Sequence, residues 1–237
     1  MGERVAQPNE PPSCMRLLSV DWDFFFVDPI GGPPTWVPEF KDGKIDFEET
    51  QFKSWLSRAT TWTKNGARLP ETSGEEREFW ARFRFAAECS LFTAEDHRFA
   101  AEPVVTENIT EVWNFDAHHD AGYERQPGEG YADENWLMAY ADNVTKYVRY
   151  PRWKKSAFDL EPHPLIEVNR KFDDGLRSER VFDRVFICRS HGFVPPWLDA
   201  DYRDFVNSCP TRLERSWPLI PREGIGNRVK SELENRR

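Results

Sequence analysis

The sequence predicts an α/β fold built on an open, mainly parallel sheet. Short apolar runs that suit buried strands alternate along the chain with segments of near-helical spacing. Clusters of Asp, His, Arg and Ser follow directly after several of these apolar runs. Because parallel strands all end at the same edge of a sheet, polar residues gathered there predict a site beyond the carboxyl ends of the strands.

The chain divides into a lead-in, one folded domain and a charged tail. Residues 1–14 are polar and rich in proline, which predicts a flexible segment. With 237 residues, of which 39% are hydrophobic, the chain can bury the core of one large domain. We therefore expect a single domain over residues 15–221 and a charged tail over residues 222–237.

The first predicted strand covers residues 15–20 and ends in two carboxylates. Asp21 and Asp23 flank Trp22, so in extended backbone the carboxylates point to one side and the indole to the other. The Gly-Gly-Pro-Pro stretch that follows, at residues 31–34, predicts the irregular backbone that commonly surrounds a site.

Two helices are expected before the next strand. Residues 47–56 have an amphipathic pattern, and residues 75–87 place acidic residues ahead of apolar ones, as is typical of a helix N-terminus. A short strand over residues 89–93 then leads to His97, and a helix should begin within residues 98–102. The 19 positions from His97 to Asp116 (116 minus 97) fit one helical crossover between neighbouring parallel strands.

The strand expected at residues 112–115 precedes the densest polar cluster. Asp116, His118 and Asp120 occupy alternate positions, so extended backbone would project them to one side. Two carboxylates and an imidazole that converge on one point are costly to bury unless a cation neutralises them. A divalent metal is the simplest neutraliser, and a solvated polar turn is the alternative.

The second half of the chain repeats the pattern of a strand followed by polar residues. A buried strand over residues 181–188 ends in Arg189, Ser190 and His191. The other elements expected here are a helix over residues 134–141, a strand over residues 144–150 and a helix over residues 197–207.

Composition narrows the functional class. The formal net charge of -9 argues against a nucleic-acid or membrane-surface binder, because both need a basic face. The four cysteines are widely spaced and form no Cys-x-x-Cys pair, which argues against disulfides and a zinc knuckle. Without a secretory signal or an apolar segment of bilayer length, the expected location is cytoplasmic. A homo-oligomer is compatible with the sequence.

Three segments resemble those that hold two manganese ions in the arginase-like (ureohydrolase) superfamily, whose fold also serves histone deacetylases. Residues 116–120, Asp-Ala-His-His-Asp, match the family's Asp-Ala-His-x-Asp segment in full. Residues 95–97, Glu-Asp-His, keep only the Asp-His of its Gly-Gly-Asp-His segment. Residues 19–23, Ser-Val-Asp-Trp-Asp, are followed by Asp28-Pro29 and match its Ser-x-Asp-x-Asp segment.

The order of these segments differs from that in arginases. There the Asp-x-Asp segment follows the Asp-Ala-His-x-Asp segment, whereas here it comes first, which indicates a circularly permuted branch of the superfamily. The resemblance covers about residues 15–125 and implies a three-layer fold, with helices on both faces of the sheet.

The resemblance also implies a set of metal ligands. One ion would be held by His97, Asp116, Asp120 and Asp21, and the other by Asp116, His118, Asp21 and Asp23, with Asp116 and Asp21 bridging. Carboxylates with imidazole as the only nitrogen ligand suit Mn(II), and Fe, Co or Zn could substitute. Glu95 and Asp96 are expected to orient His97.

Four further residues are candidates for catalysis and substrate binding. A histidine near the metals is the natural proton donor to a leaving amine, and His119 and His191 are the two candidates. In regular strand geometry His119 faces away from the metals, so a packing role is an equal alternative. Arg189 could bind a carboxylate or phosphate of the substrate beside Ser190, although an ion pair is the commoner role of arginine.

The expected function is that of a metal-dependent hydrolase, in which two Mn(II) ions share a hydroxide and direct it at an electrophilic carbon. The resemblance implies cleavage of a carbon-nitrogen bond in a small guanidino, amidine or acylamino substrate. A single-metal deacetylase-like hydrolase would need fewer carboxylates, and a catalytically inactive metal-binding accessory protein is an alternative of another class. A role in processing nucleic acid is weaker, because the chain is acidic.

Overall fold

A computed structural model describes residues 14–27, 47–122, 130–154, 161–175 and 177–236 of the chain. Most of the expected lead-in, the Asp28-Pro29 pair and the Gly-Gly-Pro-Pro stretch lie outside the described residues. Among the helices that the structure does describe, none combines the length and apolar character needed to span a bilayer.

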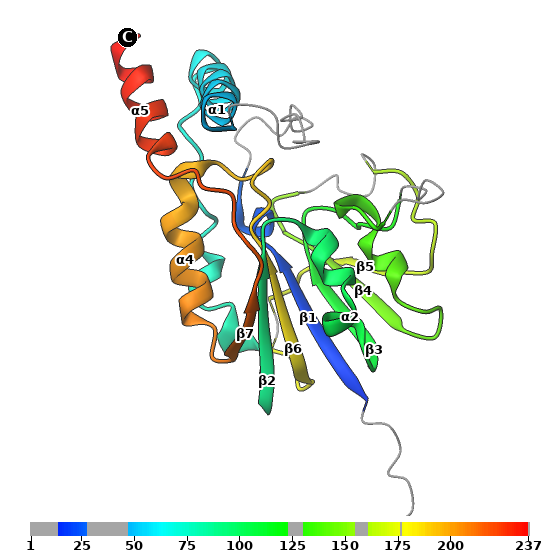
Figure 1. Cartoon of the computed structure of the whole chain (residues 1–237). Helices are drawn as coiled ribbons and strands as arrows, with labels where there is room; N and C mark the ends of the chain where they lie inside the picture. The colour runs from blue at the N-terminus through cyan, green and yellow to red at the C-terminus, as the bar shows by residue number, and fades with distance from the viewer. Residues whose placement is uncertain (1–13, 28–46, 123–129, 155–160, 176, 237) are drawn as a thin grey trace, which may run out of the picture.

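The described residues form an α/β fold with a seven-stranded, all-parallel sheet in the order β5-β4-β3-β1-β6-β2-β7 (Figure 1). β1 lies at the centre and is buried over its last five residues, as a strand covered on both faces should be. The strands are β1 (Met15–Asp21), β2 (Arg84–Ala94), β3 (Ile109–Phe115), β4 (Thr145–Tyr150), β5 (Asn169–Phe172), β6 (Val181–Cys188) and β7 (Arg212–Ser216).

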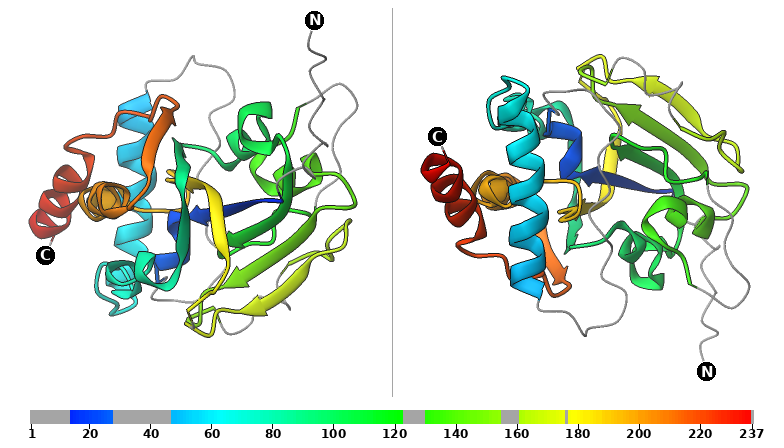
Figure 2. Two further views of the ribbon diagram at one scale, coloured as in Figure 1. Left: turned by 90° about the horizontal axis from the view of Figure 1, so that it is seen from below. Right: turned by 90° about the horizontal axis from the view of Figure 1, so that it is seen from above.

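Side chains that alternate along the strands pack into two separate hydrophobic cores. Leu18 and Val20 of β1 pack into the core that also contains residues of α1 (Phe47–Lys64), α4 (Asp199–Ser208) and α5 (Ile225–Asn235). Leu17 faces the opposite side, where the core includes Val105 of α2 (Pro103–Thr106) and Trp136 of the 3-10 helix Asp133–Ala139. Helical segments therefore cover both faces of the sheet (Figure 2).

The helix predicted over residues 75–87 is wrong. Two 3-10 turns, Glu75–Arg77 and Trp80–Arg82, occupy its first part, and β2 begins at Arg84. Phe79, Trp80 and Phe83 are all buried, and their spacing is also that of one helix face, which explains why the pattern predicted a helix. Pairing of β2 with β6 gives this stretch long-range hydrogen bonds, and these override its local helical pattern.

The expected crossover between His97 and Asp116 does not join neighbouring strands. β1 and β6 lie between β2 and β3 in the sheet, so the connection passes over two strands. It is built from the 3-10 helix His97–Ala101 and the single turn of α2, which together cover this face. Sequence spacing gives the length of a connection, but the number of strands that it crosses depends on where later strands insert.

Several predicted boundaries are shifted. The helix expected over residues 47–56 continues to Lys64, and that expected over residues 134–141 is a 3-10 helix, Asp133–Ala139. β5 and β7 were not predicted, because both are short and rich in charged residues. Within the expected tail, α5 buries Ile225, Val229 and Leu233, which lie four residues apart and form one apolar stripe.

Candidate metal centre

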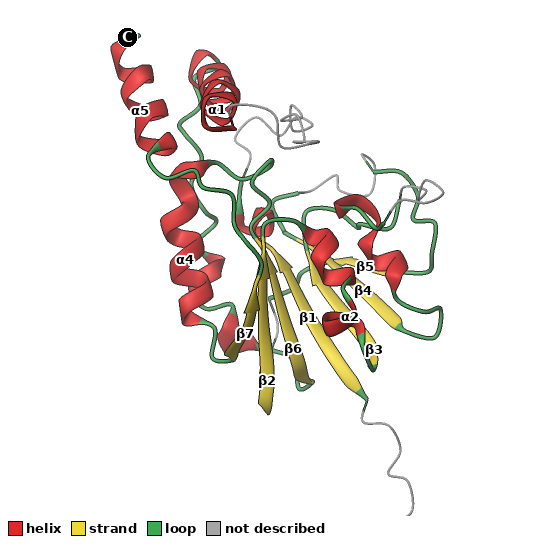
Figure 3. Ribbon diagram, viewed as in Figure 1, coloured by secondary structure: helices red, strands yellow, loops and turns green. Residues whose placement is uncertain are grey.

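The site begins as one row of side chains across three neighbouring strands. Asp21, the last residue of β1, pairs in register with Cys188, the last residue of β6. On the other side of β1, Val20 pairs with Phe115, so Asp116 comes next to Asp21. The row lies at the carboxyl ends of the strands, where the loops gather in Figure 3.

Turns, and not extended backbone, bring the next carboxylate and histidine into the site. Trp22–Phe25 is a 3-10 helix in which the Asp23 N–H donates to Asp21 Oδ1 at 3.0 Å. After β3, the His118 N–H donates to Asp116 Oδ1 at 2.7 Å. The expectation that these residues alternate along extended strands is therefore wrong, because each leading Asp caps a turn with its own carboxylate.

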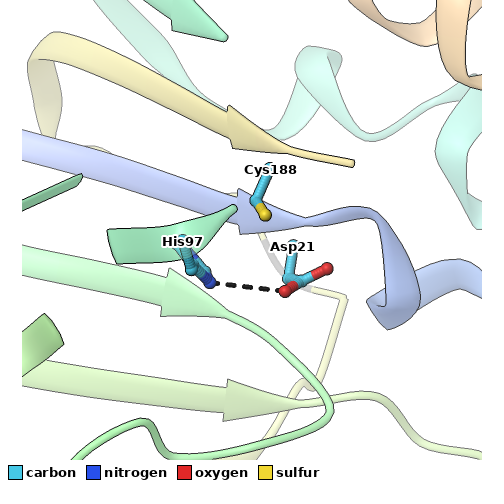
Figure 4. Close-up of side chains that lie close together, drawn as sticks. All are labelled: Asp21, His97 and Cys188. Atoms are coloured by element: carbon cyan, nitrogen blue, oxygen red, sulfur yellow. Dashed lines mark ion pairs between the residues drawn. The ribbon is translucent and has the colours of Figure 1, made fainter. Parts of the chain in front are cut away.

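His97 lies at the centre of the first group of ligand-competent atoms. Its Nδ1 atom is 3.3 Å from Asp21 Oδ2, 3.3 Å from Asp116 Oδ2 and 3.2 Å from Asp120 Oδ2. This nitrogen is buried, and none of the three carboxylate oxygens meets it in hydrogen-bond geometry. Figure 4 shows His97 and Asp21 facing one another, with Cys188 beside them. Three carboxylate oxygens that converge on one buried ring nitrogen could hold a cation.

Two aromatic rings and a hydroxyl hold the imidazole of His97 in this position. The ring stacks on Trp136 at a centroid distance of 4.5 Å and on Phe186 at 5.7 Å. On its far edge, His97 Nε2 and Ser19 Oγ are hydrogen-bonded at 2.8 Å. When Nε2 carries the proton and donates to Ser19, the lone pair of Nδ1 points at the carboxylates, as a metal ligand requires.

His118 forms a second group on the other side of Asp116. Its Nδ1 atom is 3.2 Å from Asp23 Oδ2 and 3.6 Å from Asp116 Oδ1. The two oxygens of Asp116 thus face different histidines, which is the geometry of a bridging carboxylate. Asp21 does not show the same split, because its Oδ1 accepts the Asp23 N–H while Oδ2 faces His97.

The carboxylates and imidazoles perturb one another strongly. Burial and the charges of Asp23 and Asp116 raise the pKa of Asp21 to about 7. Burial by itself lowers the pKa of His97, but Asp116, Asp120 and Asp21 raise it well above its usual range. Burial and the charge of Asp116 also raise the pKa of Asp120 well above its usual range, so carboxylates and imidazoles share protons in this buried space. A divalent cation could take the place of those protons.

Neighbouring groups fix the carboxylates in place. Asn114 Nδ2 donates to Asp116 Oδ2 at 3.0 Å, and Trp136 Nε1 donates to Asp120 Oδ2 at 2.6 Å. Ser190 Oγ donates to Asp21 Oδ2 at 2.5 Å. Asp120 and Ser190 also have positive φ angles of 51° and 50°, in a region that costs energy for residues other than glycine. Asp120 and Ser190 can keep this backbone conformation only because the surrounding structure holds them in place.

The two groups differ in access to solvent. Of these six residues, Asp21, Asp23, His97, Asp116 and Asp120 have side chains exposed by 9% or less, whereas the His118 side chain is 33% exposed. Phe193, from the loop after β6, packs beside His118 at a ring distance of 5.4 Å. Among the described residues, the cluster is therefore most accessible from the side of His118 and Phe193.

His119 points away from this cluster. Its Nε2 atom is hydrogen-bonded to the Pro162 carbonyl oxygen at 2.8 Å, and the Ala121 N–H donates to Nδ1 at 3.0 Å. Burial lowers its pKa, which favours the neutral ring that these two bonds require. This arrangement argues against the expected catalytic role and favours the packing alternative.

Gly122 provides a test of how firmly His119 is packed. A Cβ atom at residue 122 would lie 2.3 Å from His119 Cε1, so we expect Gly122→Ala to lower the free energy of unfolding by about 1–3 kcal/mol. Gly130→Ala is the matched control, because a Cβ there meets nothing within 4 Å. Urea unfolding of the two variants measures the difference, and equal stabilities would show that the His119 ring moves aside.

Arg189 makes its hydrogen bonds and ion pairs within the protein, which leaves it poorly placed to bind a substrate. Its Nε donates to Glu95 Oε1 at 3.1 Å, its Nη2 contacts Glu95 Oε2 and the Ile220 carbonyl oxygen, and its Nη1 lies 3.5 Å from Asp199. Only 6% of the residue is exposed. The structure thus places Arg189 in a buried ion pair, the alternative role weighed from the sequence. Ser190, the other expected substrate-binding residue, bonds to Asp21 instead.

Glu95 holds His191 and not His97. The His191 Nδ1 atom lies 3.3 Å from Glu95 Oε1, and the Ile220 N–H donates to Glu95 Oε2 at 2.8 Å. Although burial opposes it, hydrogen bonds from His191 and Arg189 lower the pKa of Glu95 to about 2. Asp96 caps the 3-10 helix that begins at His97, so its expected role in orienting His97 is exerted through the backbone.

The depressed pKa of Glu95 predicts part of the acid sensitivity of the fold. A carboxyl whose pKa falls from 4.5 in the unfolded chain to about 2 in the folded protein stabilises the fold above pH 4.5. This stabilisation is lost as the pH falls from about 4.5 to about 2, and it amounts to roughly 3 kcal/mol. In Glu95→Gln, the free energy of unfolding should be lower at neutral pH and should fall less steeply in acid. Denaturant unfolding across this pH range tests the prediction, and parallel curves for the two proteins would contradict it.

Asn114, Trp136 and Cys188 belong to the site but were not expected there, and Ser19 lay in a matched segment without a role of its own. Ser19 and Asn114 each stand two residues before a site carboxylate on a buried strand, so strand periodicity places them on the same face. A polar residue at this position of a buried strand is the signal that could have identified them. Trp136 offered no such signal, because it reaches Asp120 from a separate 3-10 helix.

Comparisons with protein-family models, with curated proteins and with solved structures find no match for this chain. Its function must therefore be inferred from the geometry of the site.

Proposed function

We propose that this protein is a metal-dependent hydrolase with a binuclear Mn(II) centre that cleaves a carbon-nitrogen bond. The observation that carries the proposal is the buried Nδ1 atom of His97, around which three carboxylate oxygens converge at 3.2–3.3 Å without meeting it in hydrogen-bond geometry. Because a buried polar atom without a partner is unfavourable, a ligand of opposite charge to the carboxylates is the natural occupant.

The donor atoms fit two hard divalent ions. His97, Asp21, Asp116 and Asp120 would hold the inner ion, while His118, Asp23 and Asp116 would hold the outer one. Two groups of donors that share Asp116 support a binuclear centre better than a single-metal site. When bound, two such ions act as a Lewis acid and supply a hydroxide nucleophile at neutral pH.

The chain's own residues supply orientation and a proton. Ser19 and Asn114 fix the rotamers of His97 and Asp116, so the donor atoms are preorganised. Glu95 holds Nδ1 of His191 at 3.3 Å, which fixes the position of the ring, and His191 is the proposed donor of a proton to a leaving amine. Hydrolysis of a guanidino, amidine or acylamino group needs such a donor, because a neutral amine leaves more readily than its anion.

A metal count and an assay for amine release test this proposal together. The full-length protein, purified without chelator and supplied with Mn(II), should bind two ions per chain and release amine from members of a guanidino and acylamino panel. Asp21→Ala should bind fewer ions and release none, whereas Asp142→Ala, at an exposed position, should behave as wild type. A wild-type protein that binds no divalent ion would refute the proposal, and binding without turnover on the panel would favour a metal-binding accessory protein.

A further inference from the structure

The thiol of Cys188 lies within the inner group of ligand-competent atoms. A His97 ring nitrogen, an Asp21 carboxylate oxygen and Cys188 Sγ all lie within 4.8 Å of one another. Figure 4 shows the sulfur directed toward the space between His97 and Asp21. Donor atoms on one zinc-like ion, with bonds of about 2.0–2.3 Å, are separated by comparable distances.

The backbone explains why the sulfur reaches this place. Cys188 pairs in register with Asp21 on one side and with Ala94 of β2 on the other, so the three side chains leave the same face of the sheet. Ala94 is small, and His97, three residues later, folds back over this position. The side chain at position 188 of β6 therefore lies next to the imidazole of His97 and the carboxylate of Asp21.

The contacts of the thiol itself are weak. Cys188 is fully buried, and its sulfur lies 3.4 Å from the Glu95 carbonyl oxygen and 3.4 Å from Ser190 Oγ. Cysteine thiols are poor hydrogen-bond donors, so these two contacts hold the sulfur only loosely. The Nδ1 atom of His97, which belongs to a side chain only 2% exposed and meets no carboxylate in hydrogen-bond geometry, independently indicates that a ligand belongs in the same space.

We propose that Cys188 is a sulfur ligand of the inner metal ion, and that it makes this position prefer a thiophilic ion such as Zn(II), Co(II) or Fe(II) over Mn(II). The outer position, with carboxylates and His118 as its donors, would keep the preference of oxygen ligands for Mn(II). When both kinds of ion are supplied, the two positions would then hold different metals, whereas Mn(II) supplied by itself would fill both. This inference rests on the proposed function, because it assumes that the site binds divalent ions.

Cobalt titration of the metal-free, full-length protein tests the inference without an activity assay. A thiolate bound to Co(II) gives an intense ligand-to-metal charge-transfer band in the near ultraviolet, whereas nitrogen and oxygen ligands do not. Wild type should show this band at the first equivalent of Co(II). Cys188→Ser should bind Co(II) without the band, and Cys89→Ser, which removes a buried thiol from the other core, should retain it.

Metal competition gives the second measurement. In Cys188→Ser, the preference of the inner position for Zn(II) over Mn(II) should fall by about tenfold or more, because even the loss of a residue that only supports a metal ligand commonly costs about 10- to 100-fold in affinity. Should the variant not fold, X-ray absorption of the zinc-loaded wild type still decides, because it detects a sulfur neighbour of the metal directly. Wild type that binds Co(II) and Zn(II) with no sulfur signature would overturn this inference and leave the proposed hydrolase intact. Wild type that binds no ion at all would overturn both.

Discussion

Asp116→Asn should abolish the stabilisation that divalent metal gives to this protein. At a Mn(II) concentration about 1,000 times the dissociation constant, wild type should gain about 4 kcal/mol, which would raise its melting temperature by roughly 10 °C. In the variant the metal-dependent rise should be close to zero. The reason is that Asp116 alone presents one oxygen to His97 and the other to His118, so its charge serves both positions.

Thermal melts with and without Mn(II) measure this effect. The asparagine keeps the shape of the side chain and one of its two oxygens. The difference between the two melting temperatures therefore reports the loss of the negative charge and of one oxygen that could bind metal. Asp142→Asn changes the formal charge of the chain by the same amount at an exposed position and should keep the full metal-dependent rise. Asp116 would not be a metal ligand if Asp116→Asn kept that rise as well.

Arg222→Ala should be among the most destabilising substitutions in the chain, with a loss of about 3–5 kcal/mol. The Arg222 side chain is fully buried, and its Nε donates to both oxygens of Asp199, at 3.1 and 3.0 Å. Its Nη1 also donates to the carbonyl oxygens of His191 and Val194, at 3.0 and 2.8 Å. Truncation would leave Asp199 and two carbonyl groups without this partner in the interior.

Arg236→Ala is the matched control for this prediction. Arg236 belongs to the same C-terminal segment and pairs with Glu232 at 3.0 Å, but its side chain is 52% exposed. Exposed pairs contribute about 0–1 kcal/mol, so this variant should unfold at nearly the same denaturant concentration as wild type. Similar losses for the two variants would mean that burial of the Asp199–Arg222 pair has little effect on stability.

The resemblance to arginase-like segments implied the six residues expected to hold metal, and the structure brings their side chains together. Each lies within a few residues of the end of a buried strand, and parallel strands end at one edge of a sheet. The detailed geometry differed from expectation. Turns capped by Asp21 and Asp116 replace the extended backbone, since a carboxylate next to an available N–H competes with strand continuation.

The residues that surround the cluster were harder to assign from sequence. Arg189 and Glu95 are far apart in the chain, and only the pairing of β2 with β6 makes them a buried ion pair. His119 is next to a site residue in sequence but faces Pro162 in the fold. In both cases the role of the side chain is set by the neighbour it meets in space, which local periodicity does not specify.

The sequence by itself determined the α/β class and the edge of the sheet where polar residues gather. It could do so because strand periodicity and the position of polar residues are local properties of the chain. The tertiary structure decided the strand order, the turn geometry, the burial of Arg222 within an expected tail and the position of Cys188 opposite Asp21. These features depend on contacts between residues far apart in the chain, so no single segment carries the information that sets them.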